Sequence, residues 1–367
     1  MSTEGATVAE ARDLLAELVE IPSPSGSEGR IVDRIEELAE GWSIPALRVR
    51  SELGRDSLVL GRAIEPALAI AAHVDTIAAP WPAAARIEGD VVHGLGSADD
   101  KGGVVACLLA ARDLVADGED LDRLEVAFAF PVDEERGGSG SRTVALELAP
   151  RRAIALEATG LRVGVVETGD IDVWVHVRGR SAHGALTDAG ENAIHGAVEL
   201  IGDLGRLGLE AHSHPLLGPS QAEVGAIKGG TDFNTVPDSC SFQLQIRVVP
   251  GQDGDATLAA LEELAAEHAA TVEIVEMTEP FEAAPDSPMV TALERLTTEV
   301  AGEERERIGV PAWTDAHNMV DFGGAEAVVY GPGDFSVAHL PSEHVDAGEV
   351  LQCAEVFKRL ARDAAGW

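Results

Sequence analysis

The chain has 367 residues, more than a single hydrophobic core usually organises, so we expect two domains. Its 64 acidic and 27 basic side chains give a formal net charge of -37 at pH 7. This charge excludes nucleic acid and anionic membrane surfaces as natural partners, because both repel a strongly acidic protein.

The basic residues are unevenly distributed between the two residue types. Only three of the 27 are lysines, Lys101, Lys228 and Lys358, and the rest are arginines. An excess of acid with few lysines indicates a halophile, because at ~1 M salt the Debye length is about 3 Å and self-repulsion is screened. A moderately acidic protein from a low-salt organism is the alternative.

The sequence also indicates the compartment. Its three cysteines, Cys107, Cys240 and Cys353, are widely spaced in apolar or amphipathic segments, which favours reduced core residues over a disulfide framework. The sequence shows neither a signal-like N-terminus nor an apolar run of 18 residues. We therefore expect a cytoplasmic protein with no membrane partner.

The first part of the chain predicts an α/β domain. Amphipathic helices are expected over residues 7–20 and 27–39, separated by a turn rich in proline and serine. Short apolar runs then alternate with helices, which predicts a mixed, mostly parallel sheet covered by helices on both faces. The clearest predicted strands are 67–72, 124–130, 153–156 and 327–330.

The middle of the chain has a different pattern of elements. In order, a strand (171–178), a helix (191–207), two strands (222–227, 241–249), a helix (255–269) and a strand (271–276) are expected. This β-α-β-β-α-β order is the split ferredoxin-like motif, which folds as a unit of its own. We therefore predict an inserted α+β domain at 166–280 within a larger domain made of residues 1–165 and 281–367.

Acidic and histidine side chains fall at the ends of the predicted strands. Because the carboxyl ends of parallel strands share one edge of a sheet, these side chains are expected to converge on one crevice. They are His73 and Asp75 after the first strand, Glu134 and Glu135 after the second, Glu157 after the third, His339 after the fourth, and Asp99 before a helix.

Such a cluster is typical of a metal centre. Clustered carboxylates repel unless a cation neutralises them, and imidazole with carboxylate but no thiolate suits zinc, cobalt or manganese. Two metal ions that share a bridging carboxylate make the best use of five ligands. The period-two spacing of His73 and Asp75 lets Asp75 orient the ring of His73. Glu134 and Glu135 must point differently, so one can bind metal while the other acts as a base.

Each of these signals is weak when taken alone. A Glu-Glu pair is usually a solvated loop, and Asp99 with Asp100 can simply cap a helix. Their occurrence in order, each at a strand end, supports the metal-centre hypothesis.

The chain contains five motifs, four of them around these residues: Ala72-His-Val-Asp-Thr76, Gly96-Ser-Ala-Asp-Asp-Lys-Gly-Gly103, Asp133-Glu-Glu135, Gly179-Arg-Ser-Ala-His183, and Gly331-Pro-Gly333 leading to His339. Together they make up a resemblance to the M20 metallopeptidases and deacylases. It implies two divalent metal ions, zinc or cobalt with manganese as an alternative, and hydrolysis of a linear amide bond. The implied roles are one metal on His73 and Glu157, the other on Glu135 and His339, Asp99 as the bridge, Glu134 as the general base and Asp75 as the support of His73.

The resemblance extends to the predicted insert. It implies that His183 stabilises the developing oxyanion, often across a homodimer, and that Asn234 and Arg247 contact the substrate. Arg247 can hold an α-carboxylate through a bidentate pair. The alternatives are that His183 caps its own turn and that Arg247 pairs with one of the many acids. The segment Thr314-Asp-Ala316 resembles a loop on the substrate side of the family.

The substrate is less well indicated than the reaction. Ile21-Pro-Ser-Pro-Ser-Gly26 and the segment from Tyr330 to His339 resemble hydrolases that release lysine or ornithine from LysW, an acidic amino-group carrier protein. The alternatives act on small amino-acid derivatives: acetylornithine deacetylase, succinyl-diaminopimelate desuccinylase, a dipeptidase or a carboxypeptidase. A non-catalytic binding protein on the same scaffold is remote, because all the ligand positions and Glu134 are present.

Overall fold

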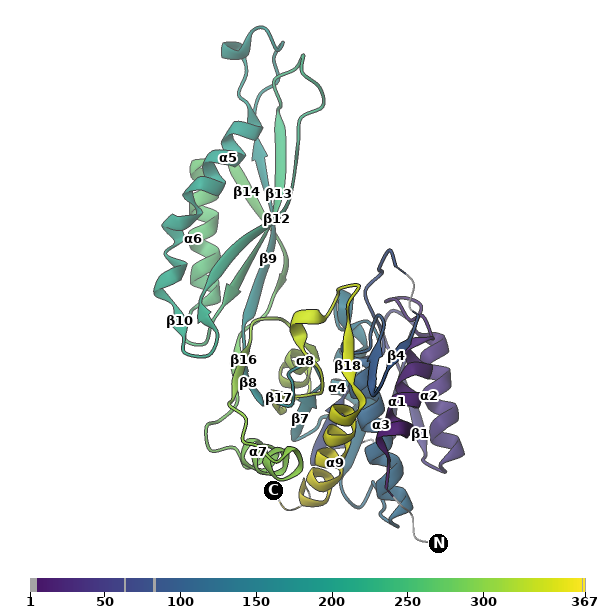
Figure 1. Ribbon diagram of the computed structural model, residues 1–367. Helices are drawn as coiled ribbons and strands as arrows, with labels where there is room; N and C mark the ends of the chain where they lie inside the picture. Colours follow the sequence, from purple (N-terminus) through teal and green to yellow (C-terminus); the bar gives the residue numbers. More distant parts are fainter. Residues whose placement is uncertain (1–4, 63, 82–83, 365, 367) are drawn as a thin grey trace. The chain divides into compact units, whose positions relative to one another are not determined.

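The computed structural model describes residues 5–62, 64–81, 84–364 and 366. The chain divides into two compact units (Figure 1). Unit 1 comprises Met1–Val165, Ala283–Ile308 and Thr314–Trp367, and unit 2 comprises Val166–Glu282 and Gly309–Trp313. The predicted insert, 166–280, was one continuous segment and did not include Gly309–Trp313.

A mixed sheet forms the centre of unit 1. Its central strand β3 (Leu68–Ala71) pairs in parallel with β6 (Val126–Phe130) and β7 (Arg152–Ala155), and β17 (Glu326–Val329) lies parallel to β7. These strands are apolar and mostly buried, as expected of a sheet covered on both faces. The predicted parallel centre is confirmed.

Antiparallel strands flank this centre. The order is β1-β2-β6-β3-β7-β17, with β1 (Ala46–Arg50) at the edge and β2 (Asp56–Gly61) antiparallel to β6. On the other side, β8 (Gly164–Glu167) begins in unit 1, where Gly164 pairs with Val329, and ends in unit 2, where it pairs with β15 (Phe281–Glu282). The short strand β16 (Ile308–Val310) also pairs with β8.

The helices of unit 1 pack in two groups. One group contains α1 (Val8–Val19), α3 (Lys101–Ala116), α7 (Pro288–Ala301) and α9 (Ala347–Ala364), and the other contains α4 (Ser139–Leu148) and α8 (Asp315–Asp321). Helix α2 (Gly29–Gly41) packs against β1 and β2, which also contact α4. A separate antiparallel sheet has the order β18-β5-β4 and is built from His344–Asp346, Val91–His93 and Arg86–Glu88. Short 3-10 turns lie at Glu134–Arg136 (η1) and Phe335–Val337 (η5).

The start of α3 is packed closely against the loop that precedes it. A Cβ atom on Gly102 would lie 2.9 Å from the carbonyl oxygen of Ser97, and one on Gly103 would lie 2.2 Å from Oδ1 of Asp100. Only glycine allows this approach, so the sequence Lys-Gly-Gly brings the segment with Asp99 onto the first turn of a buried helix.

Unit 2 has the predicted β-α-β-β-α-β order. Its strands β9 (Gly169–Arg178), β12 (Gln221–Gly229), β13 (Ser239–Val248) and β14 (Ala270–Met277) form an antiparallel sheet in the order β12-β13-β9-β14. Helices α5 (Ala193–Asp203) and α6 (Gly254–Glu267) begin at capping residues Asn192 and Asp253 and share an apolar core with the sheet. The remaining short elements are Thr187–Ala189 (η2), Leu204–Leu207 (η3), Leu209–Ala211 (η4), Ser213–His214 (β10) and Gly218–Pro219 (β11).

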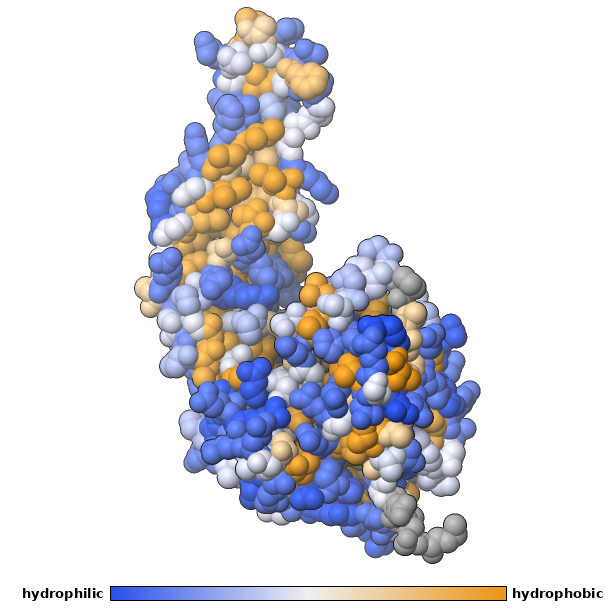
Figure 2. Space-filling model, in the orientation of Figure 1, coloured by the Kyte–Doolittle hydropathy of each residue, from blue (hydrophilic) through white to orange (hydrophobic). Residues whose placement is uncertain are grey.

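The surface is mainly hydrophilic on the face of unit 1 that Figure 2 shows. All three cysteines are buried and unpaired, as predicted. Within the part of the chain that the structure describes, every helix is either too short or too polar to cross a lipid bilayer.

Candidate metal centre

Five side chains of unit 1 meet in two overlapping groups, and three of them lie just after strands of its sheet. His73 follows β3, Glu157 follows β7, and Glu135 lies in η1 after β6. Asp99 lies just before α3, and His339 lies in the loop after η5. The strand-end positions therefore bring these residues together as the sequence predicts.

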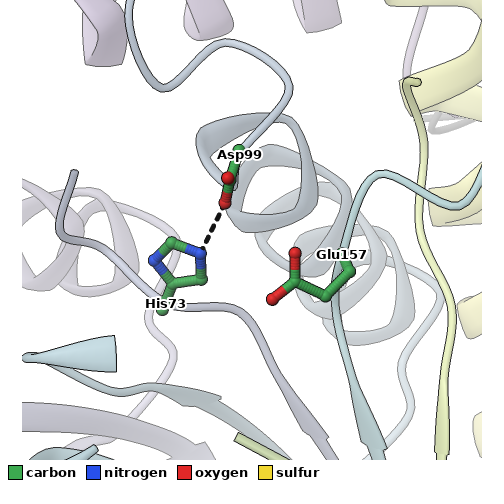
Figure 3. Close-up of side chains that lie close together, drawn as sticks. All are labelled: His73, Asp99 and Glu157. Carbon is green, nitrogen blue, oxygen red and sulfur yellow. Dashed lines mark hydrogen bonds and ion pairs between the residues drawn. The ribbon is translucent and has the colours of Figure 1, made fainter. Parts of the chain in front are cut away.

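The first group of candidate ligands is His73, Asp99 and Glu157. One ligand atom from each lies within 4.8 Å of the others, and all three residues are buried. The Nε2 atom of His73 is 2.9 Å from Oδ1 of Asp99. Figure 3 shows the carboxylate of Glu157 directed toward the same space. The group has the donor atoms and the spacing for one metal ion.

The second group is Asp99, Glu135 and His339, whose ligand atoms also lie within 4.8 Å of one another. The Nε2 atom of His339 is 3.0 Å from Oε1 of Glu135 and 3.2 Å from Oδ2 of Asp99. Asp99 thus belongs to both groups, with one carboxylate oxygen facing each imidazole. A shared carboxylate between two such groups is the arrangement of a two-metal site.

Asp75 contacts both His73 and the turn that carries Glu134 and Glu135. Its Oδ1 accepts a hydrogen bond from the backbone amide of Glu134 at 3.1 Å, and its Oδ2 accepts one from that of Glu135 at 3.2 Å. The hydroxyl of Ser25 donates to the same carboxylate at 2.7 Å. The Nδ1 atom of His73 lies 3.6 Å from Oδ1, which leaves Nε2 facing Asp99. The amide contacts were not predicted, because residue spacing says nothing of backbone donors.

The protonation equilibria of the site reflect crowded acids in a buried place. Burial raises the pKa of Glu134 well above its ordinary value, and the charges of Asp315 and Glu135 add to the rise. Burial likewise raises the pKa of Glu157. Hydrogen bonds to Asp99 and Glu135 raise the pKa of His339 to about 10. In the absence of metal ions, protons on these side chains therefore reduce the repulsion between the clustered carboxylates, a role that bound cations would otherwise take.

A second network holds the turn that carries Glu134 and Glu135. Arg55 forms ion pairs with Glu28 and Asp133, and the hydroxyl of Ser139 donates to Asp133 at 2.7 Å. Asp133 has a φ of 72° and directly precedes Glu134. Arg55 was not predicted as a functional residue, because it lies in a turn between β1 and β2, and neither strand was predicted.

Two further buried polar residues lie near the centre. Lys101 is fully buried, and its Nζ donates to the carbonyl oxygen of Ile21 at 2.8 Å. Asp315, in the predicted substrate-side segment, is buried at the start of α8, and burial raises its pKa to about 7.

The three residues predicted to contact the substrate lie in unit 2, whereas the five candidate ligands lie in unit 1. His183 and Asn234 lie on adjacent segments, because the amide of Gly184 donates to the carbonyl oxygen of Asn234 at 2.6 Å. The Nδ1 atom of His183 accepts from the amide of Ala185 at 3.1 Å. Arg247 donates to Oδ1 of Asp170 at 3.2 Å across the β13–β9 pair.

Comparison with known proteins agrees with this geometry. The sequence model of peptidase family M20/M25/M40 matches residues 69–363, which span all five candidate ligands. The chain belongs to this family. It is therefore a hydrolase of amide bonds, like the M20 proteins it resembles.

Several M20 proteins match over almost the whole chain. A putative succinyl-diaminopimelate desuccinylase of Mycobacterium tuberculosis is 31% identical, over 95% of this chain and 96% of its own. A [LysW]-lysine/[LysW]-ornithine hydrolase of Sulfurisphaera tokodaii is 28% identical, over 93% of this chain and 91% of its own. An M20 family metallo-carboxypeptidase of Sulfolobus solfataricus has the same fold, with a TM-score of 0.83, 17% identity, and coverage of 98% and 100%.

Proposed function

We propose that this M20 protein is a two-metal amide hydrolase in which Asp99 bridges the two ions. His73 and Glu157 complete one site, and Glu135 and His339 complete the other. The observation that supports this proposal is the position of Asp99, whose two oxygens face different imidazoles at 2.9 and 3.2 Å. The donors are imidazole and carboxylate without thiolate, which suits zinc or cobalt, with manganese as the alternative.

Glu134 is the general base in this proposal. When bound, two metal ions would acidify a water molecule and polarise the carbonyl of the substrate. Glu134 takes the proton of that water as its oxygen attacks the carbonyl carbon. It then passes the proton to the amide nitrogen as the C–N bond breaks, so the products are a carboxylic acid and an amine, and transfer of the acid's proton to the amine leaves a carboxylate and an ammonium ion. The position of Glu134 is fixed by its turn, because the backbone amides of Glu134 and Glu135 donate hydrogen bonds to Asp75.

Unit 2 provides the substrate contacts in this proposal. His183 donates a hydrogen bond to the developing oxyanion, while Asn234 and Arg247 hold the substrate. The proposed homodimer forms through unit 2. Its edge strand β12 and helix α5 expose apolar side chains, with Ile227 48% and Val198 59% accessible. Hydrophobic residues, drawn orange, also gather on the face of unit 2 shown in Figure 2.

The proposed substrate is lysine or ornithine joined by a γ-glutamyl amide to an acidic carrier protein of the LysW type. The similarity to the hydrolase of Sulfurisphaera tokodaii supports this choice. A second candidate is a free N-succinyl amino acid, which the 31% identity to the putative desuccinylase favours. Acetylornithine deacetylase and dipeptidase activities use the same metal chemistry and belong in the same assay.

A side-by-side comparison of substrates tests the proposal. The enzyme is loaded with zinc or cobalt in molar KCl and given carrier-linked lysine, N-succinyl-diaminopimelate, N-acetylornithine and a dipeptide in parallel. The expected result is the highest kcat/KM with carrier-linked lysine or ornithine. Preference for a free acyl compound would contradict the carrier-linked substrate but would leave the proposed amide-hydrolase activity in place. Absence of hydrolysis of every amide, with metal bound, would contradict the proposed function.

A further inference from the structure

Glu343 is a buried acid that takes no part in the proposed chemistry. It is 1% exposed and lies between the loop of His339 and strand β18. Its backbone is fixed at both ends, because its amide donates to the carbonyl oxygen of Leu340 and its carbonyl oxygen accepts from the amide of Gly94, each at 3.0 Å. These two backbone hydrogen bonds therefore fix the position of the Glu343 main chain from which the side chain extends.

The carboxylate of Glu343 reaches the backbone of the bridging residue. Its Oε1 accepts hydrogen bonds from the amides of Ala98 at 3.0 Å and Asp99 at 3.2 Å. These amides lie just before α3, whose capping residue Asp100 provides no side-chain hydrogen bond to the helix. Glu343 thus satisfies two buried donors next to the residue that both metal groups share.

Two amide donors hold one carboxylate oxygen of Glu343. A buried carboxylate with two such donors is held more firmly than one with a single contact. Lys101, two residues after Asp99, is also buried, and its ammonium group donates to the carbonyl oxygen of Ile21 at 2.8 Å.

We propose that Glu343 is a positioning residue that ties the segment of His339 to the backbone of Asp99 and thereby sets the spacing of both metal groups. The inference rests on the proposed two-metal function. Its physical basis is that His339 and Asp99 face each other at 3.2 Å, while Glu343, four residues after His339, bonds to the amide of Asp99. Without the carboxylate of Glu343, the two segments are joined by backbone contacts farther from the ligands, namely the bond from Gly94 to the Glu343 carbonyl and the β18–β5 pairing.

The test compares E343A with E343Q in the full chain. Zinc affinity is measured by competition with a chelator, and the absorption spectrum is recorded at saturating cobalt. The expected loss in E343A is about 10- to 100-fold in metal affinity, the range typical of residues that orient ligands. Its cobalt spectrum should also shift. Since glutamine keeps an acceptor oxygen, E343Q should stay within about threefold of the wild type in metal affinity.

D113A is the matched control. Asp113 also accepts a hydrogen bond from a distant backbone amide, that of Ala6 at 2.9 Å, but it contacts no candidate ligand. The D113A substitution should lower the unfolding midpoint without changing the cobalt spectrum. The unfolding midpoint of each metal-free variant separates general destabilisation from misplaced ligands.

Three results would overturn the inference. They are an E343A protein with wild-type metal affinity and spectrum, an E343Q protein as impaired as E343A, or a D113A protein with the same spectral shift. If E343A does not fold, E343Q still tests the inference through its metal affinity. A wild-type protein that binds no zinc or cobalt would contradict the proposed function itself, which distinguishes the two failures.

Discussion

The imidazole of His339 lies 3.2 Å from the carboxylate of Asp99, although the two residues are far apart in the sequence. The other oxygen of the same carboxylate faces His73 at 2.9 Å. One side chain therefore joins both candidate metal groups, and its removal should affect both ions.

Replacing the bridge and replacing a terminal ligand should give different metal contents. D99A is expected to lose both ions, because each group shares Asp99, whereas E157A should keep the ion at Glu135 and His339. The measurement is metal content per chain after dialysis against metal-free buffer. If D99A retained one tightly bound ion, Asp99 would not be the bridge.

Glu134 and Glu135 are expected to respond differently to the same change. E134Q should lower kcat about 10²- to 10⁴-fold, the usual contribution of a general base, while two metal ions stay bound. E135Q should lose metal, because Glu135 lies 3.0 Å from His339 in the second group. Hydrolysis rates and metal content are measured on both proteins. Metal loss in E134Q but not in E135Q would show that the two roles are exchanged.

Arg55 should contribute more to stability than its neighbour Arg50. R55A leaves Glu28 and Asp133 buried without a counter-charge, which should cost about 3 kcal/mol in the free energy of unfolding. Arg50 is 70% exposed and, among the residues that the structure describes, forms its ion pair with Asp56 alone, so R50A should cost less than about 1 kcal/mol. Denaturant unfolding of the two variants provides the comparison. Equal losses would mean that the Arg55 network adds little.

The stability conferred by His339 should depend on pH in the metal-free protein. Its pKa is raised from 6.5 to about 10 by hydrogen bonds to Asp99 and Glu135. The folded state therefore holds the proton more tightly than the unfolded state does. This contribution is fully present below pH 6.5 and disappears as the pH rises through about 10.

The difference between the wild type and H339A isolates this effect. The free energy of unfolding of both metal-free proteins is measured from pH 6 to 11, and the gap should close toward the alkaline end. A gap that stays constant over the whole range would contradict the assignment. With metal present, affinity should rise with pH, because the ion competes with the proton for His339.

Salt should stabilise the fold. A net charge of -37 repels itself in dilute buffer, and molar KCl shortens the Debye length to about 3 Å. The unfolding midpoint is therefore expected to rise steadily between 0.1 and 2 M KCl, which thermal unfolding of the metal-free protein measures. A midpoint unchanged by salt would favour the low-salt origin that the composition left open.

The sequence predicts the centre of the fold better than its edges. The strands around β3 were predictable because each is a short apolar run that is buried on both faces. Strand β1 has only one buried residue, Val49, so it gave no such signal. Gly309–Trp313 belongs to unit 2 only through tertiary contacts, which residue patterns in one segment do not encode.

The candidate ligands were predictable for a similar reason. Histidine and carboxylates at successive strand ends are a pattern of residue types, and the topology of a parallel sheet places them together. Arg55, Ser25 and Glu343 act through one or two contacts each, made from turns and loops. Their residue types are common at surfaces, so only the folded structure distinguishes them.

All five candidate ligands lie in unit 1, while His183, Asn234 and Arg247 lie in unit 2. If Asn234 and Arg247 select the substrate as proposed, mutations that alter selectivity fall outside the part of the chain that retains the ions. Natural variation could then remodel one module and preserve the other. Exchange of unit 2 between relatives with different substrates would be a practical route to redesign.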